Sequence, residues 1–434
     1  MSMKRKKLGE DWDDIDIDEE DEGQVEEHLV EERSRLKLEM ERREQEKRKR
    51  EKEKEKQRKS SAKRSKLPIG VIINTDKSRY EVLELLGAGG FGDVYKVRQV
   101  DEAGRGDDIF ALKTETNTSG KILNRLKMEM TILQESESLP EEKRKHFIKM
   151  IDRGRTESFK FIVMQLVGTS VDKLQKQQPK KHFTFALSLL TSIRLSTTIK
   201  LSLQTLEGIK DLHDLGYLHR DIKPQNFSIG LREKANIIYV LDFGISRRYI
   251  EKHSKAIRLP RKMVRFLGTI RFASRNCHYS REQCRRDDLE SWAYMLIEFT
   301  EYASLPWSKI IDRDLVCKEK ERLFAGTYTK HIASLPEEIH KILKYINELN
   351  FQNTPDYEYI MMMLKRAAAR KHASITAKFD WEESESETHA AKQMISCDDK
   401  YKPRNEKSEG RKPTKIRPIN VIINKVNHLE EQEQ

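Results

Sequence analysis

The residues with the clearest chemical potential lie between positions 219 and 242. The stretch G-Y-L-H-R-D-I-K-P-Q-N-F at 216–227 contains Asp221, Lys223 and Asn226, and I-I-Y-V-L-D-F-G at 237–244 adds Asp242. Moving a phosphoryl group from a nucleotide to a hydroxyl requires a proton acceptor, positive charge near the phosphate oxygens and oxygen ligands for Mg²⁺. In such a reaction Asp221 would orient the hydroxyl and receive its proton, and Lys223 would contact the γ-phosphate. Asn226 and Asp242 would bind the metal ion.

A glycine-rich segment earlier in the chain could approach the phosphates closely. G-A-G-G-F-G supplies Gly87, Gly89 and Gly92, a spacing shared by dinucleotide-binding folds and kinases. The β-prone D-V-Y-K-V follows at once and predicts the return strand of a hairpin, whereas a dinucleotide fold requires a helix there. Glu115 lies about 20 residues further on, where such a fold has its ribose-binding acid. No strand–helix–strand unit fits in that interval, so we interpret Glu115 as a coincidence.

Two further charged residues complete the constellation. Lys113 in F-A-L-K lies on the next predicted strand, where its ammonium group could reach the α and β phosphate oxygens. Glu129 in L-K-M-E-M lies on the following helical pattern and could hold that ammonium group in place. Either residue alone would be an ordinary surface charge. Together with the glycines and the later aspartates, they occur in the order that a phosphoryl-transfer site requires.

The elements that must position these residues follow from apolar spacing. Short β-like segments separated by turn residues run from 80 to 112, and a helical pattern follows at 121–133. Longer helical patterns occur at 197–213 and 287–299. The sequence therefore predicts an α+β protein in which a small sheet domain precedes a larger helical one.

Charge is distributed unevenly along the 434 residues. Lys and Arg number 84 against 72 Asp and Glu, a net charge of +12, which favours acidic or phosphorylated partners. Residues 10–22 are almost purely acidic, and residues 41–66 are almost entirely Lys, Arg and Glu. We expect residues 1–67 to form a disordered or singly helical charged extension and residues 376–434 a polar tail.

Other features narrow the class of protein. Four cysteines form no C-x-x-C pair, so we predict neither a disulfide framework nor a zinc site. The apolar stretch at 183–193 is too short to span a bilayer, and no apolar run follows the basic N-terminus. We expect a monomer in the cytoplasm, with the nucleus as a second location and no membrane association. The basic arm lacks the aromatic interleaving that base stacking requires, so no specific nucleic acid is indicated.

These motifs resemble those of protein kinases over about residues 77–372. G-T-I-R-F-A-S-R-N at 268–276 stands where kinases usually have A-P-E, and R-R-D-D-L-E-S and L-P-W follow, as in the casein kinase 1 group. Within that group, the stretch around Asp221 and P-D-Y-E-Y-I-M at 355–361 are most similar to the tau-tubulin kinase family. The resemblance implies a bilobal protein kinase fold, with a β-rich N-lobe at about 77–166 and a mainly helical C-lobe at about 169–372.

The resemblance also implies places for the nucleotide and the substrate. ATP and Mg²⁺ would be the cofactors, and K-P-x-N after Asp221 implies Ser/Thr specificity. Asp288 would brace the catalytic loop, and Arg271 and Lys320 would bind substrates that are acidic or already phosphorylated. The implied ATP-binding residues, with the adenine at the hinge, are Leu86, Gly87, Gly89, Gly92, Val94, Ala111, Lys113, Met164, Gln165 and Val167.

Several alternatives remain open. A pseudokinase would keep the fold without turnover, although the residues required for transfer are present. The basic arm could instead attach the protein to a cytoskeletal partner or to nucleic acid. Arg220 could bind a phosphorylated or acidic loop or make a structural hydrogen bond. Residues 185–194 are an apolar insertion relative to the kinase pattern, and P-I-G-V-I-I-N at 68–74 is echoed by P-I-N-V-I-I-N at 418–424.

Overall fold

The computed structural model describes only part of the chain. The described residues are 66–89, 92–117, 125–177, 191–251, 253–254 and 256–381, with backbone alone at 191–194. The charged arm, the first part of the apolar insertion, and the second copy of the heptapeptide echo lie outside them. The predictions made for these segments therefore stay predictions.

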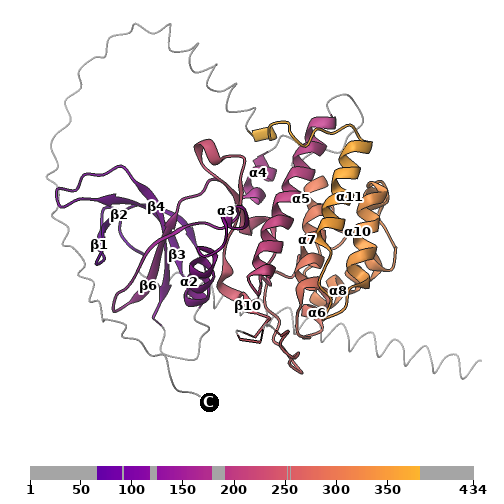
Figure 1. Ribbon diagram of the computed structural model, residues 1–434, viewed down its shortest axis with the longest axis horizontal. Helices are drawn as coiled ribbons and strands as arrows, with labels where there is room; N and C mark the ends of the chain where they lie inside the picture. The colour runs from indigo at the N-terminus through magenta and orange to yellow at the C-terminus, as the bar shows by residue number, and fades with distance from the viewer. Residues whose placement is uncertain are drawn as a thin grey trace, which may run out of the picture. The chain divides into compact units, whose positions relative to one another are not determined.

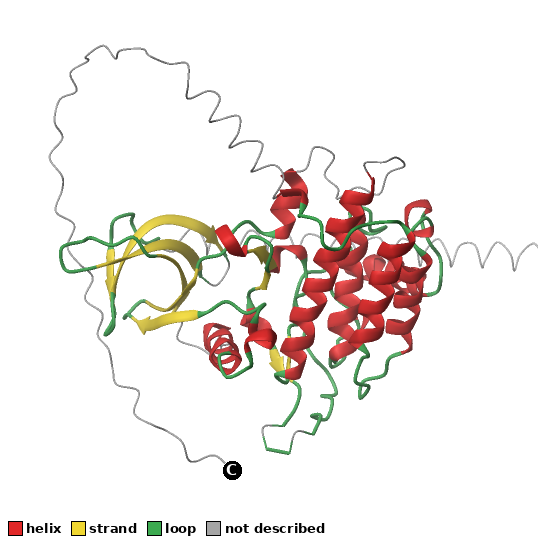
Figure 2. Cartoon of the chain, turned by 45° about the horizontal axis from the view of Figure 1, so that its top comes forward, coloured by secondary structure: helices red, strands yellow, loops and turns green. Residues whose placement is uncertain are grey.

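The N-lobe is built on one antiparallel sheet. Its strands are β1 (Ile72–Asn74), β2 (Arg79–Ala88), β3 (Asp93–Val100), β4 (Ile109–Thr116), β5 (Met150–Arg155) and β6 (Phe159–Gln165), in the order β1-β2-β3-β4-β6-β5. Alternate residues of β3 are buried, because successive side chains of a strand point to opposite faces of the sheet. The curled sheet lies to one side of the helices in Figures 1 and 2. The predicted sheet domain is confirmed.

One helix of the N-lobe matters for the site. Helix α2 (Arg125–Ser136) buries one face, which includes Leu126, Glu129 and Ile132. It packs beside β4 and β6 and against the 3₁₀ turn Phe243–Ile245. A short helix, α3 (Glu141–Arg144), follows before the sheet resumes. Helix α2 therefore lies between the sheet and the segment that contains Asp242.

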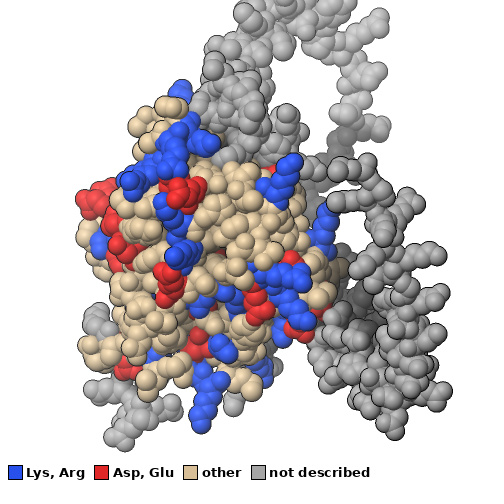
Figure 3. Space-filling model, turned by 90° about the vertical axis from the view of Figure 1, so that its right-hand side faces the viewer, with Lys and Arg blue, Asp and Glu red and all other residues tan. Residues whose placement is uncertain are grey.

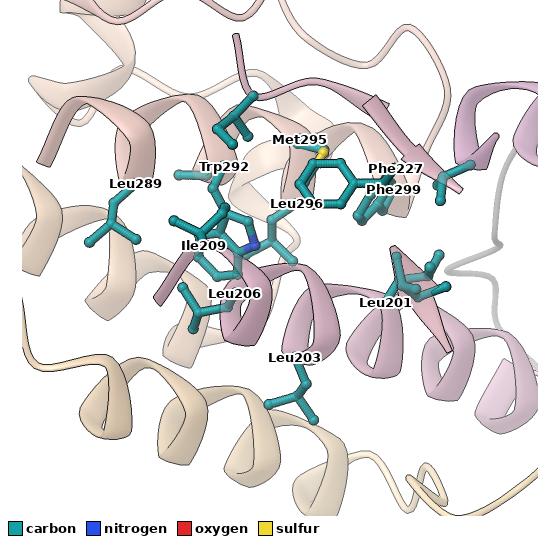
Figure 4. Packing of buried hydrophobic residues seen from close by; sticks show 14 of the residues in the cluster. Leu201, Leu203, Leu206, Ile209, Phe227, Leu289, Trp292, Met295, Leu296 and Phe299 are labelled. Carbon is teal, nitrogen blue, oxygen red and sulfur yellow. The ribbon is translucent and has the colours of Figure 1, made fainter. Parts of the chain in front are cut away.

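The C-lobe is mainly helical. Its helices are α4 (Val171–Gln177), α5 (Thr191–Asp214), α6 (Arg275–His278), α7 (Arg285–Thr300), α8 (Arg313–Phe324), α9 (Lys330–Ala333), α10 (Glu337–Glu348) and α11 (Tyr357–Arg370). Apolar side chains of α5 and α7 converge with Phe227 in the core (Figure 4). Trp292 is fully buried there, and its indole N–H donates to Thr205 Oγ1 at 3.1 Å. This core forms the base on which the catalytic segments lie.

Packing continues beyond the C-terminal boundary expected at residue 372. Phe379 and Trp381 are 3% and 6% exposed, and their rings stack 4.3 Å apart. Thr197 on α5 donates to Asp380 at 2.7 Å, and Lys200 donates to the Ala377 carbonyl. The first residues of the expected polar tail therefore form part of the C-lobe.

Charged side chains of both signs lie on the part of the C-lobe surface that Figure 3 shows. On the end where α8, α10 and α11 lie, basic and acidic side chains are interspersed (Figure 3). Within the described residues, no helix has the length and apolarity needed to cross a bilayer.

Candidate active site

The catalytic loop is held in place by one buried aspartate. Strand β7 (Tyr217–Leu218) leads into the loop, and the carboxylate of Asp288 on α7 accepts hydrogen bonds from the backbone N–H of His219 at 2.7 Å and of Arg220 at 2.9 Å. His213 Nε2 lies 2.9 Å from the same carboxylate. Burial alone would raise the pKa of Asp288, but the His213 contact and nearby imidazoles outweigh it, and the pKa falls. The bracing contact implied for Asp288 is present.

Asp221 is held by residues from two segments. Its Oδ2 lies 2.6 Å from Lys223 Nζ, and the Asn226 amide donates to its backbone carbonyl at 2.8 Å. Its Oδ1 accepts from Thr269 N at 3.0 Å and from Thr269 Oγ1 at 2.9 Å. Lys223 also donates to Thr269 Oγ1 at 3.0 Å. The carboxylate is therefore fixed in direction by a network that includes one residue from outside the catalytic loop.

Sequence reasoning missed Thr269. The segment at 268–276 was singled out only because it replaces the usual A-P-E. Gly268 has a φ of 110°, and a Cβ there would lie 2.9 Å from the Arg220 carbonyl oxygen. The glycine thus lets the chain pass close to the catalytic loop, which brings Thr269 to Asp221. The signal in the sequence that could have indicated this contact is a glycine followed directly by a residue with a hydroxyl group.

Asn226 and Asp242 are brought together by a short hairpin. Strands β8 (Phe227–Ile229) and β9 (Ile238–Val240) pair antiparallel, and Leu241 N donates to the Asn226 carbonyl at 2.8 Å. Asp242 has the left-handed conformation, with φ 62° and ψ 68°, which an aspartate adopts more readily than most residues. Within the described part of the chain no cluster of three or more His, Cys, Asp or Glu side chains could hold a metal ion. A magnesium site with few protein ligands is compatible with this, because phosphate oxygens and water supply the rest.

Lys113 joins the two lobes. Its Nζ lies 2.5 Å from Glu129 Oε2 on α2 and 3.0 Å from Asp242 Oδ1. Burial lowers the pKa of Lys113, but the two carboxylates outweigh it and raise the pKa above its ordinary value. Burial would likewise raise the pKa of Asp242, but the charge and hydrogen bond of Lys113 outweigh it, and the pKa falls to about 2. Both groups are therefore charged at neutral pH, and the predicted Lys113–Glu129 pair is formed.

The glycine segment joins two strands of the sheet, as the hairpin interpretation predicts. Gly87 pairs with Val94 across β2 and β3, and Gly89 N donates to the Gly92 carbonyl at 2.9 Å. A Cβ on Gly92 would lie 1.7 Å from the Thr114 carbonyl oxygen, so only glycine fits. Because β3 follows directly, the dinucleotide-fold alternative is excluded. Leu86, just before the turn, is 40% exposed.

The other expected nucleotide contacts lie on adjacent strands. Val94 pairs with Lys113, and Ala111 pairs with Met164. The core cluster that continues into the C-lobe includes Ala111 and Met164, and Val94 packs against it. These three residues therefore share the face of the sheet that is turned towards the C-lobe. Gln165 ends β6, and Val167 packs against the same cluster two residues later. This face, the close-fitting Gly92 and the cation of Lys113 suit an adenine nucleotide.

The two residues expected to bind substrate phosphate lie in different surroundings. Arg271 is partly exposed and lies 2.5 Å from Glu298 Oε1. Lys320 is 0% exposed, and its Nζ donates to the carbonyls of Ile270 at 2.8 Å and Ala273 at 2.6 Å. The expectation that Lys320 binds a substrate phosphate is contradicted, because its ammonium group lies beneath the loop and is used to hold it.

Arg220 makes a structural contact. Its φ is 66°, and its Nε donates to the Ile245 carbonyl at 2.8 Å. Burial, with repulsion from Arg247 and Arg261, lowers the pKa of Arg220 to about 10. Glu282 offsets this positive charge in part, because it lies 2.5 Å from Arg261 Nε and 3.5 Å from Arg247 Nε. The hydrogen-bond alternative is confirmed, and binding of a phosphorylated loop stays a prediction.

A curled antiparallel sheet, a helical lobe, and a lysine linking a helix glutamate to an aspartate after a short hairpin together define a protein kinase. Comparison with known proteins agrees. The family described as protein kinase domain matches residues 80–398, so the chain belongs to that family.

Two relatives show the extent of the similarity. A protein of Dictyostelium discoideum, named as a probable serine/threonine-protein kinase, is 33% identical over 307 residues, which cover 70% of this chain and 57% of that protein. The serine/threonine-protein kinase spe-6 of Caenorhabditis elegans is 29% identical over 326 residues, covering 73% of this chain and 79% of its own. The chain therefore spans less than two thirds of the Dictyostelium relative.

Proposed function

We propose that the protein is a serine/threonine protein kinase that transfers the γ-phosphoryl group of Mg-ATP to protein substrates that are acidic or already phosphorylated. The main support for this proposal is that contacts fix two lysines and two aspartates at the junction of the lobes. Lys113 lies 3.0 Å from Asp242, and Lys223 lies 2.6 Å from Asp221. The names of the relatives and K-P-Q-N after Asp221 support Ser/Thr specificity.

Each residue has a role that follows from its contacts. Asp221, fixed by Thr269 and Lys223, would orient the substrate hydroxyl and accept its proton. Lys223 would place its positive charge beside the transferred group, and Lys113 would contact the α and β phosphates. Asn226 and Asp242 would hold Mg²⁺, which when bound supplies charge compensation for the phosphates.

Resemblance supports a position in the casein kinase 1 group, nearest the tau-tubulin kinases. The segment 268–276 that replaces A-P-E is fixed by Lys320, whose two contacts to backbone carbonyls tie it to α8. Three exposed basic residues in the preceding segment support a preference for acidic substrates: Arg258, Lys262 and Arg265. Arg271 would contribute only in part, because Glu298 offsets its charge.

A pseudokinase is the rival proposal, and the geometry disfavours it. Residues that a pseudokinase can lose, such as Lys113, Asp221 and Asp242, are present and in contact with the partners that transfer requires. Burial opposes ionisation of the Asp242 carboxylate, but the charge and hydrogen bond of Lys113 outweigh it and hold the pKa of Asp242 at about 2.

Radiolabel transfer tests the proposal. The full chain is incubated with Mg²⁺ and γ-labelled ATP, and casein and two matched acidic peptides, one with serine and one with tyrosine, serve as acceptors. We expect label on casein and the serine peptide, and a loss of roughly a hundredfold or more in Asp221→Asn. Asp314→Asn, on the exposed surface of α8, is the matched control and should equal wild type. Binding of ATP without transfer by wild type would support the pseudokinase instead.

We further propose a monomer of the cytoplasm, with some protein in the nucleus, and a cytoskeletal partner bound through the basic arm. The net charge of +12 and the Lys/Arg-rich tract at 41–66 support attachment through the arm to an acidic surface. Removal of residues 1–66 should abolish localisation without changing label transfer. Unchanged localisation would exclude the arm as the attachment site.

A further inference from the structure

The position of α2 decides whether the Lys113–Glu129 pair exists. Glu129 projects from the second turn of this helix, and the helix lies close to the Asp-Phe-Gly turn, since a Cβ on Gly244 would lie 3.2 Å from Arg125 Cβ. A swing of the helix away from β4 would separate Glu129 from Lys113. The contacts that hold the two ends of α2 therefore bear on the phosphotransfer proposed above, and the inference below rests on that function.

The N-terminal end is held by Glu115. Its Oε1 accepts from Arg125 N at 3.1 Å and its Oε2 from Leu126 N at 3.3 Å. The first N–H groups of a helix have no partner within the helix, and the positive end of the helix dipole favours a carboxylate there. Glu115 lies two residues after Lys113 on β4. One strand thus holds the helix twice, once at its end and once through Glu129.

The C-terminal end is held by Arg248. Its Nη2 lies 2.5 Å from both carboxylate oxygens of Glu135 on α2 and 2.6 Å from the Tyr217 hydroxyl oxygen. Tyr217 donates to Glu135 at 3.0 Å, and the guanidinium lies 4.5 Å from the centre of its ring. Arg248 is 18% exposed and Glu135 is 35% exposed, so the pair is partly shielded from solvent. Charge-assisted contacts of this kind are stronger than those between fully exposed side chains.

The second contact links α2 to both catalytic segments. Strand β10 (Arg247–Arg248) pairs with β7 (Tyr217–Leu218), and β7 precedes the catalytic loop while β10 follows the Asp-Phe-Gly turn. The contact of Arg248 therefore ties the last turn of α2 to the β7–β10 pair.

We infer that Glu115 and the Glu135–Arg248 pair are positioning residues that hold α2 at both ends, where Glu129 meets Lys113. None of the three would touch the nucleotide or the substrate hydroxyl. They act through the helix, so their loss would reduce turnover by allowing Glu129 to leave Lys113.

Steady-state kinetics of the full chain tests this inference. Glu115→Ala and Arg248→Met should each lower kcat roughly tenfold, because each removes charge-assisted hydrogen bonds. The KM for the acidic peptide should stay within about twofold, since that surface lies on the C-lobe. Glu84→Ala on β2 and Arg366→Met on α11, both exposed, are the matched controls and should equal wild type.

A double-mutant cycle separates positioning from a general loss of stability. In a Glu129→Gln background the pair with Lys113 is already weakened, so adding Glu115→Ala or Arg248→Met should change kcat by less than about twofold. Hydrogen exchange of the α2 amides should rise in both single variants. Glu115→Gln and Arg248→Lys keep part of each contact. Their kcat should therefore lie between that of wild type and that of Glu115→Ala or Arg248→Met, a graded loss that general unfolding would not produce.

The outcomes are distinguishable. Single variants that match wild type, or losses of the same size in the Glu129→Gln background, would overturn the inference while leaving phosphotransfer standing. Absence of label transfer by wild type itself would instead overturn the proposed function.

Discussion

Removal of one hydroxyl group should impair catalysis if Asp221 is the proton acceptor. Thr269 Oγ1 donates to Asp221 Oδ1 at 2.9 Å and accepts from Lys223 Nζ at 3.0 Å. The variant Thr269→Val keeps the branched shape and the backbone N–H, which donates to the same oxygen at 3.0 Å. It removes only the hydroxyl bridge between the carboxylate and the lysine.

The size of the effect follows from the contacts that are lost and kept. A hydrogen bond to a charged group contributes about 1.5–3 kcal/mol. Lys223 keeps its direct contact with Asp221 at 2.6 Å, so we expect a loss near the middle of that range, about 2 kcal/mol. Each 1.36 kcal/mol corresponds to about tenfold in rate. Thr269→Val should therefore lower kcat roughly thirtyfold, less than loss of Asp221 itself.

Initial rates of label transfer to casein measure this effect. Thr269→Ser keeps the hydroxyl and should stay within about threefold of wild type. Thr327→Val, at an exposed position in the loop after α8, controls for the substitution itself. A Thr269→Val enzyme as fast as wild type, or a Thr269→Ser enzyme as slow as Thr269→Val, would refute the role given to this hydroxyl.

Three further predictions concern stability. Burial lowers the pKa of Lys320 to about 7 from its ordinary value of 10.5. Between pH 7 and pH 10.5 the unfolded chain binds one more proton at Lys320 than the folded chain does. The free energy of unfolding of wild type, relative to that of Lys320→Met, should therefore rise with pH by up to about 1.4 kcal/mol per pH unit. Chemical denaturation at about pH 7 to 10 measures this difference, and a difference that does not change with pH would contradict the prediction. Gly92→Ala should destabilise the protein by about 1–3 kcal/mol because its Cβ meets a backbone oxygen, whereas Gly87→Ala has open space and should melt like wild type; equal melting temperatures would count against the close approach. Trp381→Ala should cost about 3–5 kcal/mol in urea denaturation, against less than about 0.5 for the more exposed Ile375→Ala, and a small loss in both would mean that the C-terminal packing contributes little.

The parts of the site that the sequence predicted are those fixed by local chain geometry. The hairpin at Gly87–Gly92 follows from turn residues between β-prone segments, and Lys113 and Glu129 lie on consecutive elements. Asp221 and Asn226 lie within one loop. In each case few residues separate the partners, so residue type and spacing were sufficient to place them.

The contacts that the sequence did not predict join distant segments. The resemblance implied that Lys320 binds substrate phosphate, because a lysine is rarely buried. Its burial depends on partners about 50 positions earlier, the backbone carbonyls of Ile270 and Ala273, and on His278, whose Nε2 lies 3.1 Å from the lysine Nζ. Glu115 was dismissed once the dinucleotide fold was excluded, yet it caps α2 from β4. Trp381 was assigned to a polar tail because its neighbours are polar. Spacing along the chain carries no information about such partners.

The way in which the loop at 270–273 is secured has a consequence for how this enzyme could change over evolution. Lys320 binds the carbonyls of Ile270 and Ala273, and the Trp307 indole binds the carbonyl of Arg271 at 2.8 Å. The loop is thus attached through atoms that every amino acid possesses. Under the proposed function, substitutions at Arg271 would change the charge offered to an acidic substrate without removing these backbone contacts. They would also leave the buried Glu298 carboxylate without its arginine partner, so a change of selectivity would call for a compensating change at Glu298.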